Sequence, residues 1–235
     1  MFTPRTYRTR RSLLAVTALA AAALVATACS PGDAGRPEPG GGSGGKPAAR
    51  GTALAAVDTL TVKGRAPKTG YEREKFGRAW VDVDGNGCGT RDDILKRDLT
   101  GVRFADGHCK VASGTLAKDP YTGGSIAYAR GRSKVDVDHV VALSDAWQKG
   151  AQKWDGETRR RFANDPLNLL AVDASTNRRK SDGDAATWLP PNGAYRCTYV
   201  ARQIAVKKKY GVWVTKGERD AMKRVLTACP QQKLP

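Results

Sequence analysis

The spacing of hydrophobic and polar residues divides the chain into three parts. Residues 12–28 form a run of alanine, leucine and valine with a few small polar side chains, and residues 30–51 hold few apolar side chains among many glycines and prolines. From about residue 60 onward, apolar positions recur at the spacings of strands and helices. The pattern therefore predicts a short apolar segment, a flexible tether over 30–59 and a folded body over 60–235.

Strands are predicted where β-branched residues and leucine dominate. Residues 135–143 (VDVDHVVAL) alternate and are rich in valine, and residues 167–173 (LNLLAVD) form a second run of this kind. Residues 109–123 have the pattern of a strand followed by a turn, and residues 78–83 (RAWVDV) also resemble a strand.

Helices are predicted where apolar residues recur every three or four positions. They cover residues 92–99 and 145–154, open again near residue 175, and dominate the segment from 195 to 226. Residues 71–80 fit either a short helix or the approach to a strand. The body is therefore expected to be α+β, poor in strands and rich in loops.

The first 29 residues have the three parts of an export signal. A basic start precedes the apolar run, and small side chains follow it just before Cys29. The run of residues 12–28 is short for a membrane span, which needs about 20 apolar residues. The sequence Thr9-Arg10-Arg11 resembles a twin-arginine signal, and the choice between that route and the general secretory route stays open.

Cys29 stands where a lipoprotein signal carries its acylated cysteine. The preceding Ala26-Thr27-Ala28 lacks the usual leucine and would equally serve ordinary signal peptidase cleavage. We expect a lipid on Cys29, because the alternative leaves an exposed thiol, and this lipid is the only membrane contact predicted. The protein is thus expected outside the cytoplasm, either as a surface lipoprotein or as a secreted protein.

Four further cysteines lie in the folded body, and an even number in an exported chain indicates two disulfides. Four cysteines allow three pairings. The pairs with the shortest loops in the order of the chain are Cys88–Cys109 and Cys197–Cys229, and we expect these.

The chain carries a formal net charge of +17, of which four arginines lie in the basic start. A charge of this sign and size favours polyanionic partners: nucleic acid, an acidic wall polymer or an anionic membrane surface. A role in solubility alone would also account for this charge. The net charge therefore narrows the range of partner molecules but does not indicate a reaction.

Three short segments follow one another in the predicted strand, strand and helix. They are Val137-Asp138-His139-Val140-Val141, Asp165-Pro166-Leu167-Asn168-Leu169-Leu170 and Asn177-Arg178-Arg179-Lys180-Ser181-Asp182. In this order and context they resemble the HNH (ββα-metal) endonuclease family. The resemblance is close over residues 119–191, and the wider frame from Trp80 to Cys229 resembles small secreted actinobacterial nucleases of that family. It implies an HNH core within a small, disulfide-stapled domain whose C-terminal part is helical.

The resemblance assigns roles that suit phosphodiester hydrolysis. His139 is the expected general base, because an imidazole can take a proton from water near neutral pH. Asp138 and Asn177 are the expected metal ligands, since a hard divalent cation prefers oxygen donors. Neighbouring residues of a regular strand point to opposite faces, so the chain must bend near His139 if both Asp138 and His139 serve one site.

Three further residues complete the expected site. Asn168 matches the asparagine that braces the loop carrying the histidine in the family. Lys180 lies three residues after Asn177, on the same helical face, where it could contact phosphate, and Arg91 is a second phosphate-binding candidate. The basic helix start could equally be a solvated face. His108, the other histidine, is expected in a turn beside a disulfide.

A weaker motif precedes this site. Asp82, Asp84, Asn86 and Asp93 follow the spacing of a calcium-binding loop, except that aspartate replaces the closing glutamate. The alternative is a turn rich in aspartate, asparagine and glycine that leads into the helix at residue 92. Calcium is therefore a second cofactor candidate.

Together these observations predict an exported, metal-dependent endonuclease with little sequence specificity. Mg²⁺ is the expected metal, with Mn²⁺ as an alternative, and nucleic acid is the expected substrate, DNA being favoured over RNA. No obligate protein partner is evident. The competing interpretations are a catalytically inactive surface module that binds polyanions and a calcium-binding protein of the cell wall.

Overall fold

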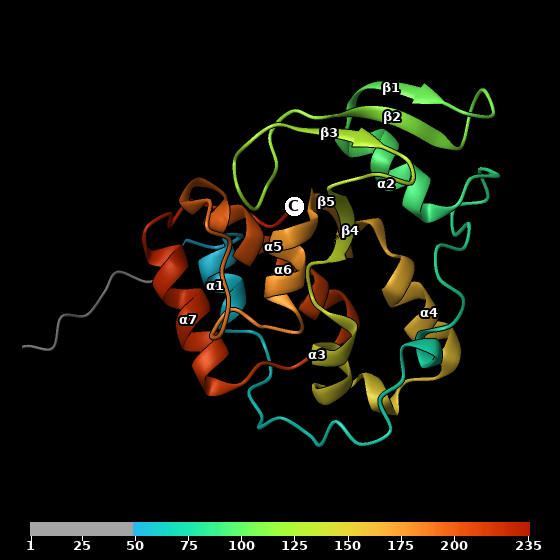
Figure 1. The fold of residues 1–235 in the computed structure, drawn as a ribbon. Helices are drawn as coiled ribbons and strands as arrows, with labels where there is room; N and C mark the ends of the chain where they lie inside the picture. The colour runs from blue at the N-terminus through green and yellow to red at the C-terminus, as the bar shows by residue number, and fades with distance from the viewer. Residues whose placement is uncertain (1–48) are drawn as a thin grey trace, which may run out of the picture. The chain divides into compact units, whose positions relative to one another are not determined.

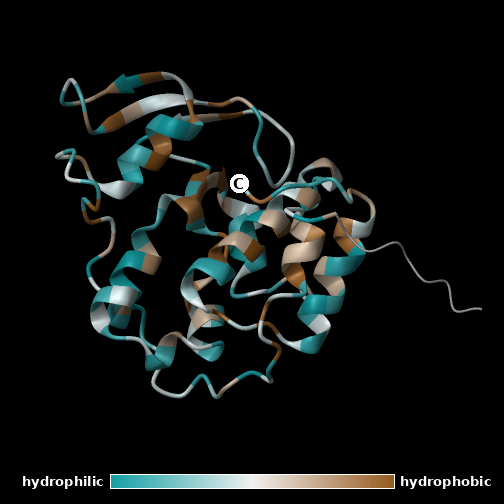
Figure 2. Cartoon of the chain, turned by 180° about the vertical axis from the view of Figure 1, so that it is seen from behind, coloured by the Kyte–Doolittle hydropathy of each residue, from teal (hydrophilic) through white to brown (hydrophobic). Residues whose placement is uncertain are grey.

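Two small antiparallel sheets lie among helices in residues 49–235, the part of the chain that the computed structural model describes (Figure 1). The expected export signal, Cys29 and most of the tether lie outside these residues. Within 49–235, no helix has both the length and the apolar character needed to cross a bilayer. Hydrophobic and hydrophilic stretches alternate along the helices and strands, as amphipathic elements around a core require (Figure 2).

The larger sheet contains β1 (Thr100–Phe104), β2 (Val111–Leu116) and β3 (Ile126–Ala129), hydrogen-bonded in that order and antiparallel. Helix α2 (Thr90–Asp98) packs beside it and buries Ile94 and Leu95. The sequence pattern predicted β2 and α2, but it missed β1 and β3, which are short and largely exposed on one face.

The smaller sheet contains β4 (Val135–His139) and β5 (Leu169–Asp173), which pair antiparallel with Asp138 opposite Leu170. Both strands are mostly buried, which explains their runs of valine and leucine. Helix α5 (Ala174–Lys180) follows directly and is capped by the side chain of Asp173. This gives the strand, strand and helix in the predicted order.

Helices surround this unit, with α1 and α7 at the left of Figure 1 and α2 at the top. Residues 49–235 also hold four short 3-10 turns: η1 (Arg73–Phe76), η2 (Ala151–Lys153), η3 (Pro166–Asn168) and η4 (Gly193–Tyr195). The remaining helices are α1 (Ala53–Val57), α3 (Leu143–Gln148), α4 (Gly156–Asn164), α6 (Arg196–Tyr210) and α7 (Lys216–Thr227). The architecture is thus α+β with a helical C-terminal part.

Three local predictions need correction. Helix α1 lies within the range expected to be a tether, but Ala53 and Val57 are fully buried and the Ala53 backbone N–H donates to the Gln232 carbonyl at 2.7 Å. The glycine- and proline-rich neighbours hide this short apolar segment in the sequence. The helix expected over 145–154 breaks near Gly150, whose φ is +128°, and helix α4 was not predicted. Residues 78–83 form no strand, because the chain turns at Trp80 with φ +59°.

Both expected disulfides are confirmed. Cys88–Cys109 joins the loop before α2 to the turn between β1 and β2, and Cys197–Cys229 joins the start of α6 to the segment just after α7. Each closes a modest loop, of 21 and 32 residues respectively. In the chain-entropy description, such links stabilise the fold by restricting the unfolded chain.

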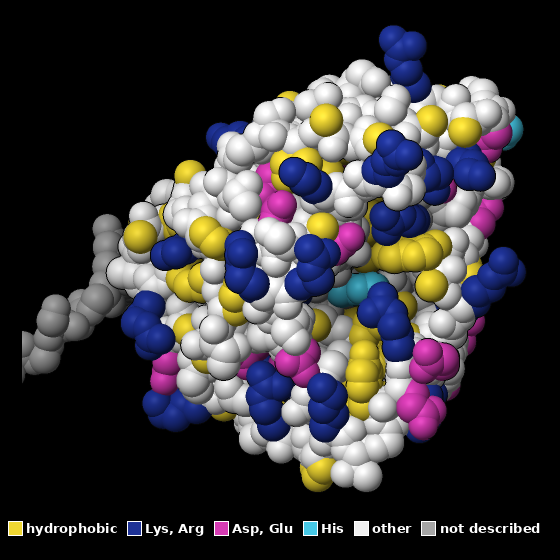
Figure 3. Space-filling view, viewed as in Figure 1, with side chains coloured by type: hydrophobic (Ala, Val, Ile, Leu, Met, Phe, Trp, Pro, Cys, Tyr) yellow, Lys and Arg dark blue, Asp and Glu magenta, His cyan; other side chains and the backbone are white. Residues whose placement is uncertain are grey.

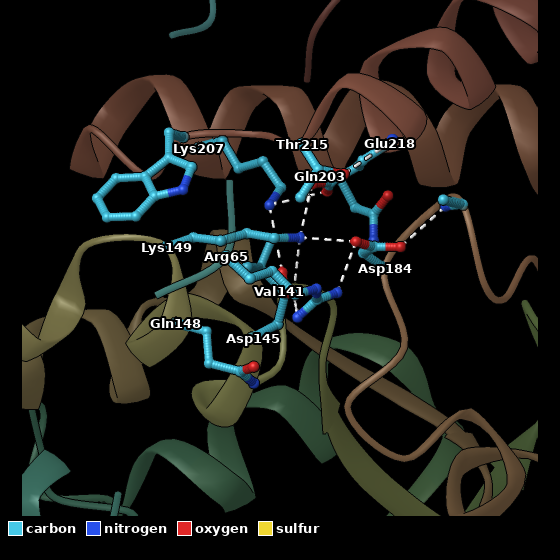
Figure 4. Close-up of polar contacts among 12 residues, drawn as sticks. Arg65, Val141, Asp145, Gln148, Lys149, Asp184, Gln203, Lys207, Thr215 and Glu218 are labelled. Carbon is cyan, nitrogen blue, oxygen red and sulfur yellow. Dashed lines mark hydrogen bonds and ion pairs between the residues drawn. The ribbon is translucent and has the colours of Figure 1, made fainter. Parts of the chain in front are cut away.

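A cluster of six charged side chains, five of them buried, joins α3, α6, α7 and the loop after α5 (Figure 4). The Lys149 ammonium lies 2.6 Å from Asp145, 2.8 Å from Asp184 and 2.6 Å from Glu218. The Lys207 ammonium adds contacts of 3.3 Å to Asp145 and 2.9 Å to Glu218. Arg65 completes the cluster from its partly exposed edge, so that three cations face three carboxylates.

Asp184 makes this cluster sensitive to acid. Burial acts to raise its pKa, but Lys149 and Arg65 outweigh burial and hold the pKa at about 2, below the ordinary 3.8. The folded protein therefore keeps this carboxylate charged at a lower pH than the unfolded chain does. Asp184 stabilises the fold fully above its ordinary pKa, and that stabilisation is lost as the pH falls through the folded-state value.

We predict that Asp184→Asn lowers the stability measured at neutral pH and removes this part of its acid dependence. Urea unfolding followed by circular dichroism between about pH 2 and pH 6 measures both. The difference between wild type and variant should be constant above the ordinary pKa and shrink below it. Asp58→Asn, at a carboxylate that is 56% exposed, serves as control. A difference that stays unchanged down to the lowest pH would contradict the prediction.

Candidate active site

A cleft of about 340 Å³ lies where the C-terminal end of β4 meets α5. One histidine is visible in a hollow of this face, among lysine and arginine side chains (Figure 3). The cleft is lined by Lys68, Tyr71, Arg73, Val137, Asp138, His139, Ala142, Leu143, Ser144, Asn177, Ser181 and Asp182. Both Asp138 and His139 reach it because β4 ends at His139 and the chain bends in the two residues that follow.

Asp138 is buried and its carboxylate has two protein partners. The Tyr121 hydroxyl donates a hydrogen bond to Oδ2, and the Lys180 ammonium lies 3.1 Å from Oδ1 and 3.0 Å from Oδ2. Burial raises the pKa of Asp138, and Lys180 and the Tyr121 hydroxyl act against that rise. Tyr121 is itself fully buried, so burial and the nearby Asp138 charge raise the pKa of its hydroxyl well above the ordinary value.

Lys180 lies in a different environment from the one expected. Its side chain is fully buried, and besides Asp138 its ammonium donates to the His139 carbonyl at 2.9 Å. A lysine inside a basic helix start is usually solvated, but here a carboxylate from β4 supplies the counter-charge. In the free protein Lys180 therefore pairs with Asp138 rather than facing the open cleft.

His139 is held in one orientation. Its Nε2 lies 2.8 Å from the Ala163 carbonyl oxygen, which can only accept, so Nε2 carries the proton and Nδ1 keeps its lone pair. The Trp80 ring stacks on the imidazole, with centroids 6.1 Å apart and planes at 17°. Burial, together with the charges of Arg73 and Lys180, lowers the pKa of His139 to about 3 despite the Ala163 contact, so the ring is neutral at neutral pH.

Asn168 is fully buried and binds the segment that follows His139. Its Oδ1 accepts from the Val141 N–H at 2.8 Å, and its Nδ2 donates to the Val141 carbonyl at 3.2 Å. Its own carbonyl accepts from the Val140 N–H at 2.8 Å. Three hydrogen bonds therefore fix the bend between β4 and α3.

Asn177 reaches the cleft from the middle of α5. Its Nδ2 donates to Asp136 Oδ2 at 3.4 Å, while no hydrogen bond to its Oδ1 is found among residues 49–235. Asp138 and Asn177 thus offer oxygen atoms from a strand and a helix that line one cleft. Within the described part of the chain, no group of three or more His, Cys, Asp or Glu side chains has the arrangement of a complete metal site.

Comparison with known proteins agrees with this geometry. Residues 89–225, more than half of the chain, match the family model described as GmrSD restriction endonucleases, C-terminal domain. A protein of Arthroderma benhamiae described as an uncharacterized secreted protein is 41% identical over 180 residues, which cover 76% of this chain and 85% of that protein.

The chain belongs to the GmrSD C-terminal domain family. The family match takes in both small sheets, α5 and all the cleft residues of β4 and α5. A nuclease domain of this family implies nucleic acid as the substrate.

Trp80, before the start of the GmrSD family match, is a site residue that the sequence analysis did not identify. It stacks on His139 on one side, and the Arg91 guanidinium lies 5.6 Å from the centroid of its ring. Its backbone is closely packed, because a Cβ on Gly89 would lie 2.9 Å from the Trp80 carbonyl oxygen. Nothing in the local pattern of a single aromatic residue indicated this stack.

The acidic loop between Trp80 and α2 is closed by its own hydrogen bonds. The Asp82 carboxylate accepts from the Gly85 and Gly87 N–H groups, both at 2.8 Å, and Asn86 Nδ2 donates to Asp84 and Asp93 at 3.1 Å. These are the contacts of the turn that the sequence analysis gave as the alternative. Calcium binding by this loop stays a prediction. His108 is exposed in the turn beside Cys109.

We predict that Asn168→Ala destabilises the protein by about 1–3 kcal/mol, because the Val141 N–H and carbonyl lose their buried partners. Urea unfolding at neutral pH measures the change. Asn192→Ala, which removes a single hydrogen bond at a partly buried asparagine, is the matched control and should have a smaller effect. Equal effects of the two substitutions would show that Asn168 does not brace the bend.

Proposed function

We propose that the protein is an exported, metal-dependent endonuclease that hydrolyses phosphodiester bonds of nucleic acid by the HNH mechanism. The observation that carries the proposal is the convergence of Asp138, His139 and Asn177 on one cleft, in a strand–strand–helix unit of a nuclease-domain family. No sequence-specific contact is implied, and DNA is the favoured substrate over RNA.

His139 acts as the general base in this proposal. With the proton on Nε2 directed at Ala163, the Nδ1 lone pair is available to take a proton from water. The water oxygen then forms a bond to phosphorus, and the bond from phosphorus to the leaving oxygen breaks. The neutral state of His139 at neutral pH is the state that this step requires.

Asp138 and Asn177 would hold the metal. Two protein oxygen donors fit Mg²⁺, which keeps several waters and often binds through one or two carboxylates together with phosphate oxygens. A carboxylate has about four lone-pair positions, so Asp138 can bind a cation while it keeps Tyr121 and Lys180. When bound, the metal stabilises charge on the phosphate and on the leaving oxygen.

Lys180 serves Asp138 rather than the phosphate in this proposal. Its buried charge opposes the rise in the pKa of Asp138 that burial causes, and its bond to the His139 carbonyl ties α5 to the end of β4. Arg91 lies over the ring of Trp80, which stacks on His139, and stays the candidate for contacting the scissile phosphate.

Export is supported by two observations. Disulfides form and persist in oxidising compartments, and this domain has two. The Arthroderma benhamiae relative is described as secreted. Anchoring through a lipid on Cys29 stays a prediction, since Cys29 lies outside the described residues.

We predict that His139→Ala lowers the rate of plasmid cleavage by about 10²–10⁴-fold, because the general base is lost. Single-turnover cleavage in saturating Mg²⁺ measures the rate, with a chelator control. His108→Ala, which changes the other histidine at an exposed turn, should cut like wild type. Added imidazole should partly restore His139→Ala. Cleavage by His139→Ala at the wild-type rate would refute the mechanism.

We predict that Asn177→Ala raises the Mg²⁺ concentration needed for half-maximal cleavage, because one oxygen ligand is lost. Metal titration by calorimetry, together with cleavage across a metal series, measures this effect. Ser175→Ala, an exposed change on the same helix, is the control. Imidazole should not rescue Asn177→Ala, and an unchanged metal dependence would exclude it as a ligand.

A further inference from the structure

The catalytic cleft continues into a second hollow of about 450 Å³. The two depressions share Lys68 and Asp182, so they adjoin one another, and the pair of them is called the trough below. The second hollow is lined by Arg65, Lys68, Gln148, Arg179, Lys180, Asp182, Gly183, Thr187 and Trp188. Lys180 lines it and also contacts Asp138, so one side chain separates the hollow from the expected metal ligand.

An arginine with no ion-pair partner among residues 49–235 lines each of the two depressions. Arg73 lines the cleft near His139, Arg179 lines the second hollow, and both are exposed. Neither has a carboxylate within ion-pair distance among residues 49–235. Arg179 is steadied by a hydrogen bond of 2.8 Å from its Nη2 to the Thr176 hydroxyl.

The acidic groups along the trough are already neutralised. Asp182 accepts from the Lys68 ammonium at 3.0 Å and from the Ser144 hydroxyl at 2.8 Å. Asp138 is paired with Lys180, and Arg65 faces the carboxylates of the buried cluster. The net charge available to a ligand is therefore positive.

Lys68 can donate a hydrogen bond to an anion while it stays paired with Asp182. An ammonium group has three donors, and one of them is used by Asp182. The chain turns sharply at residues 181–183, where Ser181 has φ +53°. The turn brings residue 183 so close to the Lys180 carbonyl oxygen that a Cβ on Gly183 would lie 2.9 Å from it. This turn carries Asp182, and through it Lys68, to the boundary between the two hollows.

We propose that the second hollow is a subsite for a backbone phosphate next to the scissile one, with Arg179 and Lys68 as its donors. The ligand is a polynucleotide strand, which runs along the trough from Arg73 past Asp138 to Arg179. The inference rests on the proposed function, because the scissile phosphate defines the centre of the trough. Each cation that contacts a phosphate contributes to the salt dependence of binding.

The test compares Arg179→Ala with Arg178→Ala, which removes the neighbouring exposed arginine that lines neither hollow. Binding of a short fluorescein-labelled single-stranded oligonucleotide is measured by anisotropy across a salt series, without added metal. Arg179→Ala should weaken binding and reduce the slope of log affinity against log salt by about 1, while Arg178→Ala should follow wild type. Arg179→Lys should recover most of the slope.

Cleavage supplies the second measurement. Arg179→Ala should raise the KM for the oligonucleotide, but it should leave turnover of bis(4-nitrophenyl) phosphate, which has one phosphate, at the wild-type rate. Equal salt slopes and equal KM values for the Arg178 and Arg179 variants would overturn the subsite, as would loss of turnover on the small substrate. If wild type cleaved neither substrate, the proposed function would fail, and the anisotropy series would still decide whether the subsite exists.

Discussion

The buried ion pair between Lys180 and Asp138 is the interaction on which the candidate site depends. It joins the helix of the strand–strand–helix unit to its first strand, and the same ammonium also binds the His139 carbonyl. A buried carboxylate without a counter-charge would take up a proton, and a protonated acid is a poor ligand for a cation. One lysine therefore both opposes protonation of Asp138 and holds the backbone at His139 in place.

A second set of buried charges holds the helices that pack around this unit. Lys149 and Lys207 bridge carboxylates from α3, α7 and the loop after α5, so these three segments are held in fixed positions relative to one another. Buried charge pairs are weak sources of net stability, because desolvation offsets much of their attraction. Their main effect here is on geometry. They fix the position of α3, which follows the bend at His139, relative to the C-terminal helices.

The sequence predicted those parts of the fold whose signals are local. The valine-rich strand at Asp138, the strand after Asn168 and the two disulfides follow from periodicity and from loop length. The burial of Lys180 did not follow, because its partner lies 42 residues earlier in the chain and a basic helix start normally indicates solvent. The Trp80 stack depends on a positive φ at a residue type that rarely adopts one, so no propensity could have indicated it.

Among residues 49–235, only Trp80 and Ser181 combine a side chain with a positive φ; Trp80 stacks on His139, and Ser181 lines the cleft that His139 also lines. Such backbone conformations cost about 1–3 kcal/mol each, and glycine would relieve that cost. Glycine at either place would also remove a side chain next to the candidate site. At position 80 this is the indole that stacks on the imidazole, and at position 181 it is the hydroxymethyl group that lines the cleft with Asn177. Selection for thermal stability alone would thus act against the side chains that surround His139 and Asn177, so at these two residues stability and activity oppose each other.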